Sequence, residues 1–268
     1  MRGAPAGGTG ADQYGVAMRE THDSVYFDQW YADMASSGRD AIIARAMGLP
    51  AEMRDAGVLS WLGIAELTQE LGLGPDGLLF DIACGRGGYG IEVARRAGAR
   101  LAGVDLSAVA IERAKENGAR RLPAGRARFQ TGTLLATGLP TGAADAVMCV
   151  DAVQFAEPPL AALLEFRRLL RSGGRLALTC WEAVDPSDER VPARIRAVNL
   201  QRDLTEAGFL GVEVHEKPEW RAAERAMWED AVAADASDPA VRSLQAEGRR
   251  SLATFDSMRR VFATAGAP

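Results

Sequence analysis

The stretch LFDIACGRGGYG, residues 79–90, passes from an apolar run into a glycine-rich turn and then into an amphipathic segment. This order is typical of a buried strand that leads through a tight turn into a helix. Glycine lets the backbone turn sharply, and its missing Cβ lets a bulky ligand come close to the main chain. The stretch therefore predicts an α/β fold with a ligand-binding turn after its first strand.

Short apolar runs alternate with amphipathic helical segments after this turn, which indicates βαβ units and a mostly parallel, doubly wound sheet. The predicted strands are 78–83, 100–105, 127–131, 145–150, 175–181 and 211–216, with a short last strand at 259–264. The predicted helices are 89–97, 108–118, 160–170 and 196–207. Residues 171–174, RSGG, are expected to form a turn between a helix and the next strand.

Residues 14–268 are expected to form one domain. Its predicted parts are a helical cover at 14–75, a core at 76–217, a helical lid at 218–256 and the last strand at 257–268. Residues 1–13 are rich in Gly and Ala and are expected to be a disordered tail, because they lack the apolar run of a signal peptide or membrane helix. A cytoplasmic location is the corresponding expectation.

Charge and metal-binding residue types exclude several classes of function. The net charge of -5 argues against a nucleic-acid substrate, because such binding depends on neutralising phosphates with a basic surface. The two histidines, His22 and His215, have none of the spacings of a zinc site. The cysteines Cys84, Cys149 and Cys180 form no CxxC pair and are expected to be reduced and buried. We expect a small-molecule substrate, and we expect no metal, nucleic acid or membrane as partner. The sequence is compatible with a homodimer.

Two acidic residues indicate which ligand the turn holds. The GxGxxG spacing of Gly85, Gly87 and Gly90 is by itself a weak sign of a dinucleotide. Asp81, four residues before Gly85 (85 - 81), would repel a pyrophosphate and suits a cationic ligand such as a sulfonium with an α-ammonium. Asp105, twenty residues after Gly85 (105 - 85), ends the next strand, where a carboxylate accepts both ribose hydroxyls of either NAD or S-adenosylmethionine (SAM).

Four segments taken together resemble a known family. They are DIACGRGG at 81–88, VDLS at 104–107, ADAVMCVDAVQF at 144–155 and LLRSGGRLALTCW at 169–181. Their order resembles that of class I SAM-dependent methyltransferases, and the chain is similar to actinobacterial small-molecule methyltransferases of natural-product pathways, including antibiotic biosynthesis. The resemblance extends from Tyr26 to the C-terminus. It implies a seven-stranded, mostly parallel, Rossmann-like sheet whose last strand pairs antiparallel beside 211–216.

The resemblance also implies the cofactor S-adenosyl-L-methionine and the residues that bind it. The glycine turn would wrap the methionine part, the acid after the second strand would hold the ribose, and residues after the third strand would flank the adenine. The cofactor-binding residues carried over by position are Asp81, Ala83, Gly85, Gly87, Asp105, Leu106, Thr133, Leu134 and Asp151. The family often has Asp where this chain has Thr133, so a hydroxyl would have to meet the adenine amino group.

The methyl acceptor is expected at the carboxyl ends of the strands, where open α/β sheets bind their ligands. The predicted acceptor contacts there are Gln154, Phe155 and Trp181, with Tyr26, Trp30 and Tyr31 of the cover closing over them. For each aromatic residue, packing of the cover on the core is the alternative. The predicted catalytic residues are His22, as a general base, and Asp151, which would orient the acceptor or the SAM ammonium unless it only shapes its loop.

Three functions remain to be distinguished. The leading hypothesis is methyl transfer to a small specialised metabolite, with oxygen slightly favoured over nitrogen or carbon as acceptor atom. A protein that keeps the SAM fold for another reaction, such as cyclisation, is the second, because fold does not determine function. An NAD-dependent oxidoreductase is the third and is disfavoured by Asp81.

Overall fold

The computed structural model describes residues 24–33, 37–53, 57–235 and 237–268. Its centre is a seven-stranded sheet with the order β3-β2-β1-β4-β5-β7-β6. The strands are β1 (Leu78–Ile82), β2 (Arg100–Asp105), β3 (Ala127–Thr131), β4 (Ala144–Val150), β5 (Leu170–Ala183), β6 (Leu210–Glu216) and β7 (Met258–Gly266). The first five run parallel, and β7 lies antiparallel between β5 and β6. The predicted doubly wound, seven-stranded sheet with an antiparallel last hairpin is therefore confirmed.

Helices cover both faces of this sheet, because successive strand residues point to opposite sides. Leu79 and Met148 pack in the core that includes the side chains of α3, whereas Phe80 and Val147 pack in the core that includes those of α6. The helices of the two layers are α3 (Trp61–Leu71), α4 (Gly88–Ala97), α5 (Ala108–Arg121), α6 (Pro159–Leu169), α7 (Ala193–Arg196) and α8 (Leu200–Glu206).

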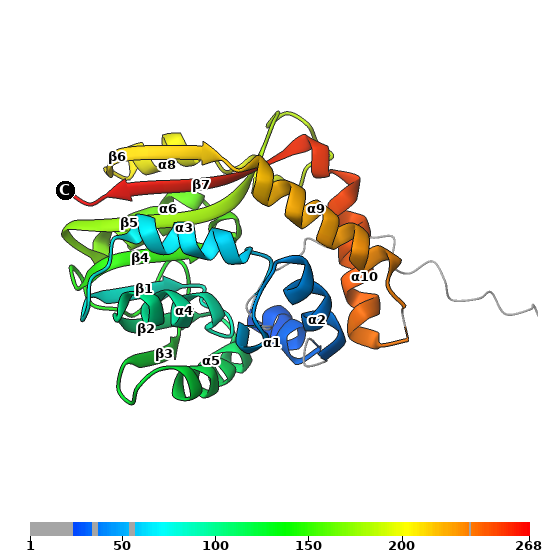
Figure 1. Ribbon diagram of the computed structural model, residues 1–268. Coiled ribbons are helices and arrows are strands. Elements are labelled where there is room, and N and C mark those ends of the chain that lie inside the picture. Colours follow the sequence, from blue (N-terminus) through cyan, green and yellow to red (C-terminus); the bar gives the residue numbers. More distant parts are fainter. Residues whose placement is uncertain (1–23, 34–36, 54–56, 236) are drawn as a thin grey trace, which may run out of the picture.

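Four further helices gather at one end of the sheet. They are α1 (Ser24–Asp33), α2 (Ser37–Ala46), α9 (Pro218–Ala233) and α10 (Pro239–Ala253). Figure 1 shows them on the side toward which the parallel strands point, so they lie at the carboxyl ends of these strands. The described residues also form three single turns of 3-10 helix: η1 (Ala51–Met53), η2 (Val153–Phe155) and η3 (Phe255–Ser257).

Two details differ from the sequence prediction. The single helix expected over 196–207 is two helices, α7 and α8, because the side chain of Asn199 caps a new helix by accepting a hydrogen bond from the Arg202 backbone N–H. The expected turn at 171–174 lies within β5 as an irregularity: the register moves from Ala144 opposite Leu170 to Ala146 opposite Arg175. Gly173, at a φ of 71°, supplies the left-handed conformation that this bulge contains.

Candidate active site

The glycine-rich turn joins β1 to α4 through three residues in the left-handed backbone region: Ala83 (φ 60°), Gly85 (φ 53°) and Gly87 (φ 81°). The Cys84 N–H donates to the Val104 carbonyl at 2.9 Å, which ties the turn to the end of β2. A side chain at Gly87 would meet Ile91, Ala114 and Phe129 within 3.0–3.3 Å. Positive φ is uncommon for alanine, so the turn is held in its shape by its surroundings.

Asp105 ends β2 directly beside this turn. Its Oδ2 accepts a hydrogen bond from the Gly85 N–H at 2.8 Å, and its Oδ1 accepts one from the Ser107 N–H at 2.9 Å. The residue is 7% exposed, and burial raises the pKa of its carboxyl. Each carboxylate oxygen keeps a further lone pair, so both can accept hydroxyl groups of a ribose.

Asp81 lies under the same turn and is more deeply buried. It is 2% exposed, and its Oδ2 has no hydrogen-bond partner among the described residues. Burial first, and repulsion from Asp105 second, raise the pKa of Asp81 to about 7. An unpaired buried carboxylate beside a second carboxylate is relieved by a positive charge and opposed by a negative one. These residues therefore fit SAM, with its sulfonium and ammonium, and do not fit the pyrophosphate of NAD.

Helix α1 is attached to this region through Asp28. Its Oδ1 accepts hydrogen bonds from the Ser107 hydroxyl and, at 3.3 Å, from the Val109 N–H at the start of α5. The same helix brings the Tyr31 hydroxyl to 2.7 Å from the position that a Cβ on Gly85 would take. Burial, and then Asp105, raise the pKa of Tyr31. The sequence analysis expected Tyr31 at the acceptor, whereas the structure places its hydroxyl against the cofactor turn.

Aromatic rings from α1 and η2 meet beside this turn. The rings of Phe27 and Phe155 make an edge contact with 5.6 Å between centroids, and the guanidinium of Arg194 lies 5.2 Å from the Phe155 ring centroid. Trp30 makes an edge contact with Tyr31 at 4.8 Å. The structure thus brings together three of the predicted acceptor contacts on one wall: Trp30, Tyr31 and Phe155.

The remaining predicted acceptor contacts lie around this wall. Tyr26 is 44% exposed and packs edge-on against Phe27. Gln154 is buried, and its Nε2 donates to the Asp151 carbonyl at 2.7 Å. Trp181 is buried and contacts Phe255, which comes directly after α10. Gln154 and Trp181 are thus packed in the interior at this end of the sheet, and their contact with an acceptor stays a prediction.

Asp151 has partners that the sequence analysis did not foresee. Its two carboxylate oxygens accept hydrogen bonds from Nη1 and Nη2 of Arg260, and the Thr179 hydroxyl donates to Oδ1 at 2.7 Å. The residue has a φ of 57°, in the left-handed region. These contacts neutralise Asp151 and hold the loop after β4, which agrees with the alternative that Asp151 shapes its loop. Its role in orienting the acceptor or the SAM ammonium stays a prediction.

The structure shows where the residues predicted to flank the adenine lie, and it describes one of the two histidines. Leu106 and Leu134 are half-buried, whereas Thr133 is exposed and its hydroxyl oxygen accepts a hydrogen bond from the Ala136 N–H at 3.0 Å. His22, the predicted general base, lies outside the described residues. His215 is exposed on β6, where its Nε2 lies 3.3 Å from Glu213.

Arg260 and Glu224 are the charged residues of this end that sequence reasoning missed. Arg260 is 1% exposed; it follows the exposed Arg259 and precedes the buried residues Val261 and Phe262 of β7. A charged residue next to an apolar run was the available signal, since such a residue must be paired when it is buried. Glu224 gave no comparable signal, because α9 also carries exposed acidic residues.

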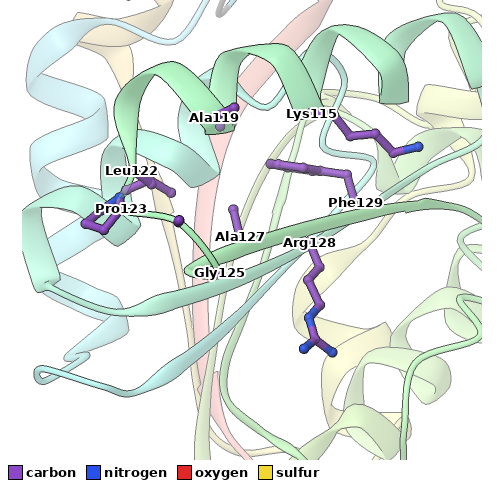
Figure 2. Close-up of a pocket in the computed structure, with 10 residues that line it drawn as sticks. Lys115, Ala119, Leu122, Pro123, Gly125, Ala127, Arg128 and Phe129 are labelled. Atoms are coloured by element: carbon purple, nitrogen blue, oxygen red, sulfur yellow. The ribbon is translucent and has the colours of Figure 1, made fainter.

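Two surface hollows lie at the other end of the sheet. One, of about 390 Å³, is between α5 and the start of β3; Figure 2 shows Phe129 pointing into it and Arg128 pointing to the opposite side of the strand. The other, of about 400 Å³, is lined by residues 71–77 with Asp145, Arg171 and Arg175. Both border the amino ends of strands, away from the glycine turn.

The described part of the chain contains no group of three or more His, Cys, Asp or Glu side chains arranged to hold a metal ion. It also contains no helix with the length and apolar character needed to cross a bilayer.

Comparison with known proteins agrees with the geometry of the turn. Residues 80–178, from β1 into β5, match the family model described as a methyltransferase domain. The sequence is 25% identical over 142 residues to an O-methyltransferase of Aspergillus sclerotiorum, covering 49% of this chain and 54% of that protein. It is 27% identical over 122 residues to a sterol 24-C-methyltransferase of Neurospora crassa, covering 46% of this chain and 32% of that protein. The chain thus spans about a third to a half of the length of these curated relatives.

A solved structure extends the similarity in fold to the rest of the chain. The phosphoethanolamine N-methyltransferase 2 of Haemonchus contortus, in complex with S-adenosylhomocysteine, superposes with a TM-score of 0.69 at 18% identity. The match covers 89% of this chain and 59% of that one. The chain is therefore similar to methyltransferases in sequence over residues 80–178 and in fold over most of its length. The named proteins differ in whether carbon, oxygen or nitrogen receives the methyl group.

Proposed function

We propose that this chain transfers the methyl group of S-adenosyl-L-methionine to a small-molecule acceptor. The observation that carries the proposal is the pair of buried carboxylates at the glycine turn. Asp105 offers both oxygens to a ribose, and Asp81 holds an unpaired oxygen where a cation is favoured. A nucleoside that also bears positive charge matches both features, whereas a dinucleotide matches only the first.

The residues of the turn would bind and orient the cofactor. Bound SAM supplies an activated methyl group on a positively charged sulfur. Asp105 would hold the ribose hydroxyls, Asp81 would favour the α-ammonium, and Gly85 and Gly87 would let the methionine part approach the main chain. Further cofactor contacts proposed by position are Ala83, Leu106, Thr133 and Leu134.

The acceptor would lie beside the aromatic rings of Phe27, Trp30 and Phe155. Methyl transfer is an in-line displacement, so alignment of the two reactants and exclusion of water contribute most of the catalysis. Rings from α1 that pack against η2 serve both purposes. We propose a small specialised metabolite of natural-product type with oxygen as acceptor atom, an assignment supported by the O-methyltransferase relative. The sequence analysis expected His22 as a general base, and this residue lies outside the described part of the chain.

We further propose that the chain works as one domain without a nucleic-acid partner, which the net charge of -5 supports. A cytoplasmic location is proposed from Cys84, Cys149 and Cys180, which are free and buried.

The test is calorimetric titration with S-adenosylhomocysteine and, separately, with NADH. We expect micromolar binding of S-adenosylhomocysteine and a loss of about tenfold or more in Asp105→Ala, since hydrogen bonds to a charged group contribute about 1.5–3 kcal/mol each. The control variant is Glu112→Ala, which removes an exposed carboxylate on α5 and should bind like the wild type. Binding of NADH in place of S-adenosylhomocysteine, or unchanged binding in Asp105→Ala, would contradict the proposal.

A further inference from the structure

A buried group of charged side chains lies between α9 and the sheet. Arg260 of β7 faces Asp151 after β4 on one side and Glu224 of α9 on the other. Arg260 is 1% exposed and Glu224 is 5% exposed. Two carboxylates therefore share one guanidinium in a place from which water is largely excluded.

The two carboxylates differ in how many hydrogen bonds they accept. Asp151 accepts hydrogen bonds from both terminal nitrogens of Arg260 and from the Thr179 hydroxyl. Glu224 Oε2 lies 3.7 Å from Arg260 Nε, beyond hydrogen-bond distance, and has no hydrogen-bond partner among the described residues. Only Oε1 is engaged, by the indole N–H of Trp228 at 3.3 Å. A buried carboxylate oxygen without a hydrogen-bond partner destabilises the fold, and such exceptions occur at functional sites.

The group lies at the end of the sheet where an acceptor is expected. Asp151 directly follows β4, and Arg260 pairs in register with Trp181 near the carboxyl end of β5. The side chain of Asp151 is 21% exposed, so the group borders the molecular surface at this end of the sheet. Glu224 therefore lies, with its unpaired oxygen, at the end of the sheet where open α/β folds bind their ligands.

We propose that Glu224 is the general base of the reaction and accepts the proton of the hydroxyl that becomes methylated. This proposal rests on the proposed function. The bond between the methyl carbon and sulfur breaks and its electron pair stays on sulfur. The new bond forms between the acceptor oxygen and the methyl carbon, and the hydroxyl proton moves to Glu224 Oε2. Release of that proton to water resets the site. The acceptor is accordingly an uncharged, proton-bearing nucleophile, and a phenol suits the neighbouring aromatic residues.

The electrostatics of the group agree with this role. Burial is the largest effect and raises the pKa of Glu224 to about 7, against the lowering effect of Arg260. Asp151 and, from α10, Glu247 raise this pKa, whereas the Trp228 N–H lowers it; Tyr89 of α4 also faces the group. A base with a pKa near the working pH both takes up and releases a proton readily.

The test compares Glu224→Gln with Glu229→Gln, an exposed carboxylate on the same helix. Transfer from labelled SAM to catechol, 4-hydroxybenzoate and tyramine is measured from about pH 6 to about pH 9, and S-adenosylhomocysteine binding is measured for each protein. We expect both variants to bind S-adenosylhomocysteine within about twofold of wild type, and kcat to fall about 10²- to 10⁴-fold only in Glu224→Gln. Turnover of Glu224→Gln within about threefold of wild type, with the same pH profile, would overturn the proposal.

A second measurement does not depend on the acceptor. The midpoint of urea unfolding should fall in wild type as the pH rises through about 7, and this dependence should be weaker in Glu224→Gln. Equal pH dependence in the two proteins would also overturn the role of Glu224 as a proton acceptor. Absence of S-adenosylhomocysteine binding in wild type, by contrast, would count against the proposed function and not against this assignment alone.

Discussion

Asp81 is the buried carboxyl whose ionisation is expected to depend on the positive charge of the ligand. Its pKa of about 7 in the free protein reflects burial and the neighbouring Asp105. Because this pKa is raised, the carboxyl contributes stability that is present below its unfolded pKa of about 4 and is lost as the pH rises through about 7. A bound cation lowers the pKa of Asp81 again, since it favours the ionised form of the carboxyl.

The first prediction concerns the pH dependence of cofactor binding. Below about pH 7, binding of the α-ammonium of S-adenosylhomocysteine must release the Asp81 proton. The affinity should therefore fall by up to about tenfold for each unit by which the pH decreases. Above about pH 7 the affinity should not depend on pH. Calorimetry in buffers of different ionisation enthalpy measures both the affinity and the released proton. Asp81→Asn should bind more weakly and show a flatter profile; the same slope in this variant would assign the proton to another group.

The second prediction concerns Gly90, which faces the same carboxylate from α4. A Cβ at this position would lie 2.4 Å from Asp81 Oδ2 and 3.0 Å from Asp81 Cβ. Gly90→Ala should therefore lower the free energy of unfolding by about 1–3 kcal/mol, as overpacking does, and weaken S-adenosylhomocysteine binding. Gly74→Ala, where nothing lies within 4 Å of the added Cβ, is the matched control. Urea unfolding compares the two, and equal stability would show that Asp81 moves aside without cost.

At the scale of elements, apolar alternation predicted the strands within a residue or two, because a half-buried or buried strand needs that pattern. The exception is β5, whose start at Leu170 depends on pairing with Ala144 across the sheet. No local pattern reports such a partner. The helical segment after β5 was likewise predicted as one helix, because its apolar spacing continues through the cap at Asn199.

The third prediction follows from that cap. Asn199 Oδ1 accepts a hydrogen bond from the Arg202 N–H at 3.0 Å and so satisfies a backbone donor that the helix leaves unpaired. Asn199→Ala should lower the free energy of unfolding by about 1 kcal/mol without changing S-adenosylhomocysteine binding. Gln201→Ala, an exposed position in the same helix, should change it by less than about 0.5 kcal/mol. Equal stability of the two variants would mean that tertiary packing alone ends α7 and begins α8.

The residues of the candidate site likewise fall into two groups: those that local sequence predicts and those that tertiary packing brings together. Asp81, Asp105 and the glycines could be predicted because the turn and the strand end are contiguous in sequence and their spacing is set by the βαβ unit. Asp151 was identified as a site residue, but its partner Arg260 comes from β7 through the antiparallel register. Glu224 comes from α9, and its proximity depends on how that helix packs over the sheet. Neither relation has a counterpart in local sequence.

At the scale of the whole molecule, salt bridges connect the glycine turn to the helices around it. Arg86, within the turn, makes two hydrogen bonds to Asp40 of α2, at 2.9 and 3.0 Å. The neighbouring Arg39 pairs with Glu247 of α10 at 3.2 Å. A ligand that orders the turn is therefore expected to affect α1, α2 and α10 together, which Figure 1 shows at the same end of the sheet.

The fourth prediction uses this arrangement to locate the site without knowledge of the acceptor. S-adenosylhomocysteine at a hundredfold its Kd should raise the free energy of unfolding by about 2.7 kcal/mol. Hydrogen exchange measured by mass spectrometry should slow in the turn at 83–90, in α1 and at the start of α5, because Asp28 and Tyr31 connect these segments. It should stay unchanged at 71–77, which line a hollow at the opposite end of the sheet. In Asp105→Ala, a roughly tenfold weaker Kd should reduce the rise in unfolding free energy at the same ligand concentration to about 1.4 kcal/mol. Slower exchange at 71–77 in wild type would place the ligand at the wrong end for this mechanism.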